Sequence, residues 1–331
     1  MAARKRASSS SSRTARQAVK TAEGLGLSPV LSALLVLIAA VFLYCVYLEN
    51  DTEDVPPAAV SSFISEDADL EIHFIDVGQG DCSLIKWNGR AMLIDSGEKE
   101  EADTVLDYLK KQKVTRLDYI IVTHPHSDHM GSMSEIISAL SVGKVIAPRV
   151  SDEMTPTSKT YESFLLALRN KALKLTAAKP GTVYTFEDSS EGGKKPPEFE
   201  ILAPLDDYDD LNNYSVVLRL TYGSTAYLFM GDAEKKSEKA ILESGANVDS
   251  DVLKVGHHGS STSTGSGFLE EVSPDICIIQ CGAGNTYGHP HKDTVEAIEK
   301  AGAKWYSSDR DGTIIVYSDG ERIYLQTEKA S

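Results

Sequence analysis

The sequence has 331 residues, of which 41% are hydrophobic and 25% are charged, and its formal net charge is -16. This composition is typical of a globular protein and excludes a collagen-like, a disordered or a multi-span membrane chain. The charge is unevenly placed: residues 1–27 hold six basic side chains and one acidic one, and the remainder carries a net charge of -21. A protein that binds nucleic acid through bulk positive charge is therefore excluded as well.

The chain is expected to begin with a cytoplasmic tail, residues 1–27, and a transmembrane signal anchor, residues 28–48. Residues 28–48 contain no charged side chain and would form a helix of roughly 30 Å, enough to cross a bilayer. Basic residues precede this segment and acidic residues follow it, so the positive-inside rule predicts that the rest of the chain is extracellular. A cleaved signal peptide is the alternative, although no small-residue cleavage site follows directly. Residues 49–69 are polar and acidic and contain prolines, which is typical of a linker.

Residues 70–331 alternate between strand-like and helix-like segments. Strands are expected at 70–76, 82–87, 91–95, 117–123, 143–147, 198–203, 215–222, 225–230, 251–256, 275–280, 312–317 and 321–326. Helices are expected at 101–113, 131–141, 158–171, 233–244, 266–272 and 292–301. Many strands interspersed with helices predict a layered α/β domain. Its cysteines match no zinc motif, and buried free thiols are expected.

A first group of ligand-type side chains follows the apolar segment 117–122. It contains His124, His126, Asp128 and His129 within six residues. In extended geometry His124 and His126 point to the same side, whereas Asp128 and His129 come after the chain turns. Imidazole and carboxylate suit zinc and other transition metals, so the two pairs predict a site for two cations.

Two later strand ends carry further candidates. Asp232 follows the apolar segment 225–230, and His257 and His258 follow segment 251–256. An aspartate after a strand is by itself more often a turn residue than a ligand. Loops at strand ends are nevertheless where functional side chains are usually displayed, so these residues join the candidate site.

In combination, these motifs resemble the metallo-β-lactamase superfamily. The His-x-His-x-Asp-His segment at 124–129 is followed in order by a strand-end Asp232 and the strand-end His257, and LIDSG at 93–97 precedes them. Four other segments look like the extracellular hydrolase domain of the ComEC competence proteins: FIDVGQGD at 74–81, NNYSVVL at 212–218, HHGS at 257–260 and YGHPH at 287–291. The resemblance covers residues 70–327. It implies an αββα four-layer sandwich with two divalent metal ions at the edge of two packed sheets.

The resemblance also implies a ligand set, with zinc as the first candidate metal and manganese as the second. The first metal would be bound by His124, His126 and Asp232, completed by water or another oxygen. The second metal would be bound by Asp128, His129, Asp232 and His257, with Asp232 as the bridge. Members that cleave β-lactams supply a further histidine between the first motif and the strand-end aspartate. No histidine lies between His129 and His257, which argues against β-lactamase activity.

Catalytic and substrate-binding roles are expected for a second set of residues. Asp128 or Asp232 would orient the attacking water or take its proton. His258 would donate a hydrogen bond to a phosphoryl oxygen or serve packing, and His289 would stabilise developing charge or protonate a leaving oxygen. Asn213 and Ser215 would bind substrate or hold the loops. Asp76 and Asp81 would support the site from behind, and His291 would start a helix.

The leading expectation is a membrane-anchored, extracellular phosphodiesterase or nuclease acting on DNA. The acidic body favours an alternative, a small or cell-wall-linked phosphodiester or another ester as substrate, because repulsion opposes the binding of a large polyanion. A non-enzymatic binding module is the third interpretation. The expected partners are the lipid bilayer and the phosphodiester substrate, and no obligate protein partner is expected.

Overall fold

The computed structural model describes residues 68–186 and 195–329. The predicted cytoplasmic tail and membrane anchor lie outside these residues, as does most of the predicted linker. Within the described part of the chain, no helix is both long enough and apolar enough to cross a membrane.

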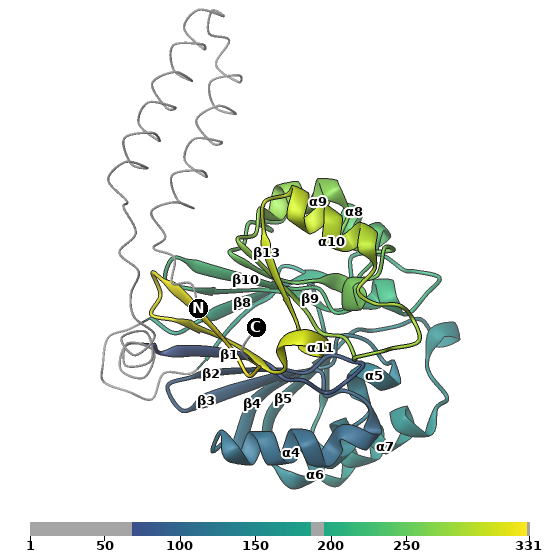
Figure 1. The fold of residues 1–331 in the computed structure, drawn as a ribbon. Helices are drawn as coiled ribbons and strands as arrows, with labels where there is room; N and C mark the ends of the chain where they lie inside the picture. Colours follow the sequence, from purple (N-terminus) through teal and green to yellow (C-terminus); the bar gives the residue numbers. More distant parts are fainter. Residues whose placement is uncertain (1–67, 187–194, 330–331) are drawn as a thin grey trace, which may run out of the picture.

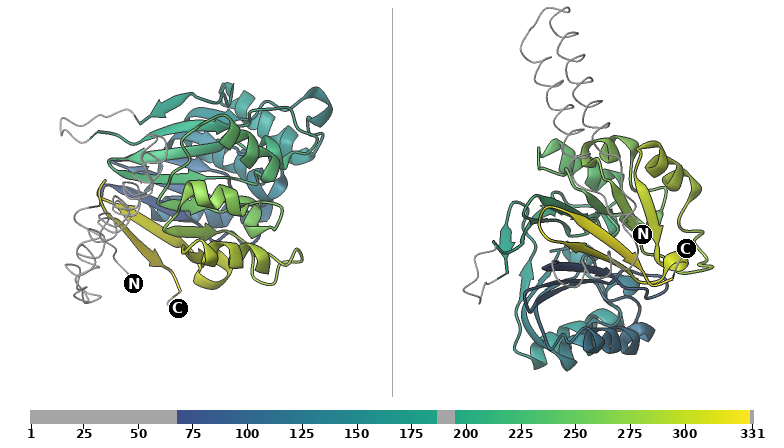
Figure 2. Two further views of the ribbon diagram at one scale, coloured as in Figure 1. Left: turned by 90° about the horizontal axis from the view of Figure 1, so that it is seen from above. Right: turned by 60° about the vertical axis from the view of Figure 1, so that its left-hand side comes forward.

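Two β-sheets pack face to face (Figure 1). The 8-stranded sheet has the order β15-β14-β1-β2-β3-β4-β5-β6. Its strands are β1 (Leu70–Phe74), β2 (Ser83–Trp87), β3 (Arg90–Ile94), β4 (Arg116–Ile121), β5 (Ser141–Ala147), β6 (Leu175–Ala177), β14 (Ile314–Ser318) and β15 (Ile323–Thr327). Because β1 pairs with β14, the first and last parts of the domain lie side by side (Figure 2).

The 7-stranded sheet has the order β13-β12-β11-β10-β9-β8-β7. Its strands are β7 (Val183–Thr185), β8 (Glu198–Ala203), β9 (Val217–Tyr222), β10 (Thr225–Phe229), β11 (Val252–Lys254), β12 (Ile276–Ile279) and β13 (Lys304–Ser307). Strands β10 to β13 run parallel to one another, so the loops that follow them leave the sheet at one edge.

Helices cover the outer face of each sheet (Figure 1). Helices α4 (Ala102–Lys111), α6 (Met133–Ala139) and α7 (Lys159–Asn170) lie on the first sheet, and α8 (Lys235–Glu243), α9 (Ser266–Val272) and α10 (Lys292–Lys300) lie on the second. Shorter elements are α5 (Ser127–Met130), α11 (Ser308–Asp311), and the 3-10 helices η1 (Lys99–Glu101), η2 (Asp152–Met154), η3 (Asn212–Tyr214) and η4 (Gly256–Gly259). The predicted αββα sandwich is therefore the observed arrangement of layers.

The main core lies between the two sheets. Alternate residues of β1, among them Leu70, Ile72 and Phe74, point into it, as expected for a strand with one face on each layer. Phe74 stacks on Phe229 of the other sheet with ring centroids 6.0 Å apart. Each sheet also packs against its own helices through one further apolar cluster. Burial of every residue on both faces explains why β10 is almost entirely apolar in sequence.

All six predicted helices occur, but three strands were not predicted. Strands β6, β7 and β13 contain only three or four residues and are partly exposed, so they lack the apolar run that indicates a strand. Cys82, Cys277 and Cys281 are buried free thiols, which confirms that prediction for the described cysteines.

Candidate metal centre

The ligand-type residues converge at the edge where strands of both sheets end. Strands β3 and β4 are parallel neighbours, so Asp95 and the segment starting at Thr123 emerge side by side. In the other sheet, β10 and β11 are parallel neighbours and deliver Asp232 and the histidine pair 257–258 to the same edge. Parallel strand order is thus what brings segments more than 100 residues apart into one cluster.

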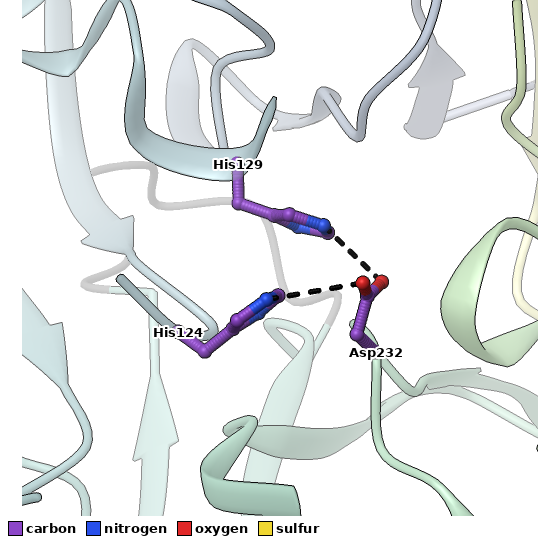
Figure 3. Close-up of side chains that lie close together, drawn as sticks. All are labelled: His124, His129 and Asp232. Atoms are coloured by element: carbon purple, nitrogen blue, oxygen red, sulfur yellow. Dashed lines mark ion pairs between the residues drawn. The ribbon is translucent and has the colours of Figure 1, made fainter. Parts of the chain in front are cut away.

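Asp232 lies at the centre of this cluster and is only 2% exposed. Its Oδ1 is 3.2 Å from Nε2 of His129 and 3.6 Å from Nε2 of His258. Its Oδ2 is 3.8 Å from Nε2 of His124 and 3.6 Å from Nε2 of His257. Figure 3 shows the rings of His124 and His129 approaching the carboxylate. Each carboxylate oxygen therefore faces its own pair of histidines.

Asp128 and His126, the other two candidate ligands of the first motif, lie on opposite sides of Asp232. Asp128 Oδ2 lies 3.2 Å from Nε2 of His258 and 3.9 Å from Nε2 of His129. His126 Nδ1 lies 2.9 Å from Nε2 of His124. His258 therefore occupies the place beside Asp128 and His129 that was predicted for His257. The prediction is corrected at this point, because sequence order alone does not say which of two adjacent histidines turns inward.

The backbone of η4 explains how two adjacent histidines face different oxygens. His257 (φ 47°, ψ 51°) and His258 (φ 53°, ψ 23°) both adopt left-handed conformations that residues with a Cβ rarely occupy. Such residues cost about 1–3 kcal/mol each and persist where the surroundings enforce them. The double left-handed turn reverses the chain so that His258 is buried and His257 lies nearer the surface.

Contacts behind the ligands fix their orientation. Asp95 Oδ2 is 2.8 Å from Nδ1 of His129, and Thr123 donates to the same carboxylate from its backbone N–H and its hydroxyl. The Nδ1 of His258 lies 2.9 Å from the carbonyl oxygen of Gln280. A histidine whose Nδ1 is held in this way presents Nε2 to a metal with its tautomer defined.

Asn213 and Ser215 are buried parts of the framework rather than substrate-binding residues. Asn213 is fully buried, accepts hydrogen bonds from the backbone N–H groups of Glu234 and Ser237, and donates to Asp210. It therefore anchors the loop after Asp232 and the start of α8.

Ser215 is also fully buried, and its Oγ accepts a hydrogen bond from the backbone N–H of Asp232 while lying 3.3 Å from Nδ1 of His124. It connects two predicted ligands. Neither side chain has a surface that a substrate would reach, so of their two predicted roles the structure favours holding the loops over substrate contact.

Two charged residues of the site were not predicted. Lys254 is buried, and its Nζ lies 2.7 Å from Oδ2 of Asp81, whose other oxygen is 3.2 Å from Nδ1 of His258. Glu234 lies 3.1 Å from Nδ1 of His257 and accepts a hydrogen bond from Thr262. A lysine at the end of a strand and a glutamate before a helix carry no sequence signal of such roles. The expected support by Asp81 is observed, whereas Asp76 contacts Lys329 and the backbone of Gly78.

The carboxylates dominate the electrostatics of the cluster. Burial alone would lower the pKa of His258, but Asp232, Asp81 and Asp128 outweigh it and raise that pKa to about 10. The pKa of His129 is raised well above its usual value for the same reason, against burial and through Asp232, Asp128 and Asp95. Burial opposes ionisation of Asp232, yet the neighbouring histidines hold its pKa well below the usual range. The site is therefore built to hold positive charge between carboxylates.

His289 lies at the outer side of the histidine cluster. Its ring centroid is 5.6 Å from that of His257 and 6.1 Å from that of His258. Burial and the neighbouring histidines lower its pKa to about 4, so it is neutral at pH 7. Its Nδ1 is buried and has no hydrogen-bond partner. His291 caps α10 as predicted, and its ring contacts Ser261 and the carbonyl of Tyr287.

The donor set fits divalent cations. Nε2 of His129 and Oδ1 of Asp232 are buried atoms that make no hydrogen bond, although they point at each other. Buried polar atoms are normally satisfied, so an unpaired nitrogen and oxygen at the centre of the cluster fit a site that is able to bind a cation. Ligand atoms of three residues approach within 4.8 Å of one another in four overlapping groups among the described residues: His124, His129 and Asp232; Asp128, His129 and His258; Asp81, Asp232 and His258; and Asp81, Asp95 and His129.

Comparison with known proteins gives the family. The sequence model of a protein family, described as the metallo-beta-lactamase superfamily, matches residues 75–282. The chain is 30% identical over 266 residues to ComE operon protein 3 of Bacillus subtilis, an alignment covering 74% of this chain and 32% of that protein. It is 28% identical over 264 residues to Recombination protein 2 of Haemophilus influenzae, an alignment covering 77% of this chain and 30% of that protein. The chain thus spans about a third of the length of these relatives.

Among solved structures, a mutant of CmlA beta-hydroxylase matches with a TM-score of 0.51 at 13% identity, covering 88% of this chain and 60% of that one, a likeness of fold alone. The chain is also 30% identical over 247 residues to Competence protein ComA of Neisseria gonorrhoeae, an alignment covering 72% of this chain and 31% of that protein. These relatives confirm the predicted resemblance to the ComEC type. Because the family model covers more than half of the chain, this protein belongs to the metallo-β-lactamase superfamily.

Proposed function

We propose that this protein is a metal-dependent phosphodiesterase that uses two cations and acts on DNA. One observation carries the proposal: the buried carboxylate of Asp232 presents one oxygen to His129 and His258 and the other to His124 and His257. A carboxylate between two sets of nitrogen donors is the arrangement that bridges a pair of metal ions. Such pairs are typical of enzymes that cleave phosphate esters by in-line displacement.

The two sides of Asp232 define the proposed ligand sets. The Oδ2 side comprises His124, His126 and His257. The Oδ1 side comprises Asp128, His129 and His258. In this assignment His257 supplies the first side with a third imidazole. Both zinc and manganese suit donor sets of imidazole and carboxylate.

When bound, two cations supply a water of lowered pKa and positive charge at the phosphoryl oxygens. The side chains of this protein contribute orientation and proton handling around that water. Asp128 is the partly exposed carboxylate of the set, so it is the residue placed to accept a proton from an incoming water. His289 is neutral at pH 7, which makes it a hydrogen-bond donor to a phosphoryl or leaving oxygen rather than a protonated acid.

DNA is the preferred substrate class because one relative is named Recombination protein 2, and recombination is a process of DNA, while another is named Competence protein ComA. The net charge of -21 beyond residue 27 opposes a large polyanion. The activity is therefore expected to be weak on DNA at low salt and to depend on added divalent metal. A small phosphodiester is the alternative that this charge favours.

The proposal is tested with the purified full-length protein loaded with zinc or manganese. Single-stranded DNA, plasmid DNA, bis-nitrophenyl phosphate and a β-lactam are compared as substrates. Cleavage of DNA that stops on chelation and is lost in Asp232→Ala supports the proposal. Cleavage of the small diester without DNA would assign the small-substrate alternative. Hydrolysis of the β-lactam with all phosphodiesters untouched would refute both.

We also propose that residues 28–48 anchor the hydrolase domain at the outer face of the cell membrane. The support is the uncharged stretch between a basic and an acidic flank. In that location the substrate would be extracellular DNA or a wall-linked phosphodiester.

A further inference from the structure

Tyr287 is the most exposed large hydrophobic side chain in the described part of the protein. Its exposed fraction is 65%, compared with 57% for Val183 and 41% for Leu165. Single exposed apolar residues are common on protein surfaces. The position and the rigidity of Tyr287 distinguish it from such residues.

Tyr287 lies beside the outer histidines of the cluster. Its ring is stacked on His289, with 5.6 Å between ring centroids and an interplanar angle of 19°. His289 in turn lies 5.6 Å from His257, centroid to centroid. One ring therefore separates the exposed face of Tyr287 from the candidate metal ligands.

The loop that carries Tyr287 is held by its own side chains. Asn285 donates hydrogen bonds to the carbonyl oxygens of Gly282 and His289 and accepts one from the backbone N–H of His289. His291 contacts the carbonyl oxygen of Tyr287 at 3.1 Å. An aromatic ring that is kept in the open by a fixed loop is preorganised for contact with a ligand.

We propose that Tyr287 is a specificity-determining residue that stacks on a nucleobase adjacent to the phosphodiester at the metal centre. This inference rests on the proposed function, which it deepens by naming the part of the substrate that is read. Aromatic side chains bind bases of single-stranded nucleic acids by stacking, and they do so with little dependence on sequence. Binding through the base also suits an acidic protein, because it adds affinity without contacts to the phosphate backbone.

A quaternary ammonium group is the competing ligand for this position, because the face of an aromatic ring also attracts such groups. Among the described residues, the ring that stacks on Tyr287 is that of His289, and the opposite face of Tyr287 is left open. A single open face suits stacking on one flat base, whereas ammonium groups are typically held in a cage of several aromatic rings.

The test compares two substrates that differ in the base. Thymidine 5′-(p-nitrophenyl phosphate) carries a nucleobase, whereas methyl p-nitrophenyl phosphate carries none. With the full-length, metal-loaded protein, Tyr287→Ala should raise KM for the thymidine ester about 5- to 100-fold and leave kcat nearly unchanged. The KM and kcat for the methyl ester should not change in Tyr287→Ala. Tyr287→Phe keeps the aromatic ring and should behave as the parent with both esters. Tyr317→Ala, which removes a tyrosine on β14, is the matched control.

Equal effects of Tyr287→Ala on both esters, or no effect on either, would overturn the inference. So would a larger effect on p-nitrophenyl phosphorylcholine than on the thymidine ester. Affinity for labelled oligothymidine and for an abasic strand of the same length gives a readout without turnover. If the parent cleaves neither ester and no DNA, the proposed function fails. In that case the inference still stands if Tyr287→Ala weakens the binding of oligothymidine and leaves the binding of the abasic strand unchanged. It is refuted if the parent protein binds oligothymidine and the abasic strand with equal affinity.

Discussion

The ammonium group of Lys254 lies 2.7 Å from Oδ2 of Asp81, and both side chains are almost completely buried. The other oxygen of Asp81 contacts Nδ1 of His258, whose Nε2 faces Asp128. Lys254 therefore holds a carboxylate in its ionised form directly behind a candidate metal ligand. A buried lysine at the end of a strand would otherwise be unfavourable, so its place is explained by this contact.

Removal of Lys254 should leave the charge of Asp81 buried without its partner. Lys254→Met is expected to lower the free energy of unfolding by about 3–5 kcal/mol, measured by urea denaturation. The double variant Lys254→Met with Asp81→Asn should recover part of this loss. Lys292→Met, which breaks an exposed ion pair with Glu296, should leave the midpoint unchanged. An equal loss in the single and double variants would contradict a charge-pair explanation.

The histidine pair should divide between two cations. His257→Ala and His258→Ala are each expected to lose one of the metals measured by calorimetry and elemental analysis, because they face different oxygens of Asp232. Adding His124→Ala to His257→Ala should cause little further metal loss, since both lie on the Oδ2 side. Adding Asp128→Asn to His257→Ala should remove the second ion as well. Retention of both ions at parental affinity by His257→Ala would show that His257 is not a ligand.

His289 should affect turnover rather than metal content. His289→Ala is expected to reduce kcat on the order of 100-fold, the usual cost of one hydrogen-bond donor to a developing oxyanion, while both metals stay bound. Because its pKa is lowered to about 4, the loss should be the same at pH 6 and pH 8. His289→Asn keeps a donor and should recover part of the rate. A loss that follows metal content would instead assign His289 to metal binding.

Glu238 should make the stability of the protein depend on pH. This buried carboxyl accepts hydrogen bonds from the N–H groups of Thr264 and Gly265, and burial raises its pKa from 4.5 to about 7. The folded state therefore favours the protonated form. Its contribution to stability is present below pH 4.5 and is lost as the pH rises through 7, a change of up to about 3 kcal/mol.

Comparison with Glu238→Gln isolates this effect. In metal-free protein, the free energy of unfolding of the variant minus that of the parent should rise between pH 4.5 and 7.5. Glu243→Gln changes an exposed glutamate at the end of the same helix and should show no such trend. A difference that is flat across this pH range would mean that Glu238 titrates normally.

The proposed topology predicts which part of the protein a protease reaches. Protease added to intact cells should remove the hydrolase domain and spare a short N-terminal fragment that contains the basic tail, followed with an antibody to residues 1–20. Lysed cells serve as the control for digestion of that fragment. Protection of the domain until the membrane is opened would reverse the proposed orientation.

Much of the fold class and the composition of the site could be predicted from the sequence. Apolar strand segments interspersed with helices indicate a layered α/β domain, because each apolar face must be buried against another element. The sandwich of two sheets was implied by the resemblance of the motifs to the family. Ligand-type residues were also visible, because four of them occur within 124–129 and such density is unusual outside metal sites. These features are local, so they are read from short stretches of chain.

Tertiary structure decided which residue faces which partner. The inward turn of His258 depends on two successive left-handed residues, and no periodicity in the sequence indicates that conformation. Asn213 and Ser215 became framework residues because η3 and β9 are covered by other segments once the sheets pack. Lys254 forms an ion pair with Asp81, which is 173 positions earlier in the sequence, because β11 ends beside the loop after β1. Contacts between distant segments arise from sheet order, which short-range patterns do not encode.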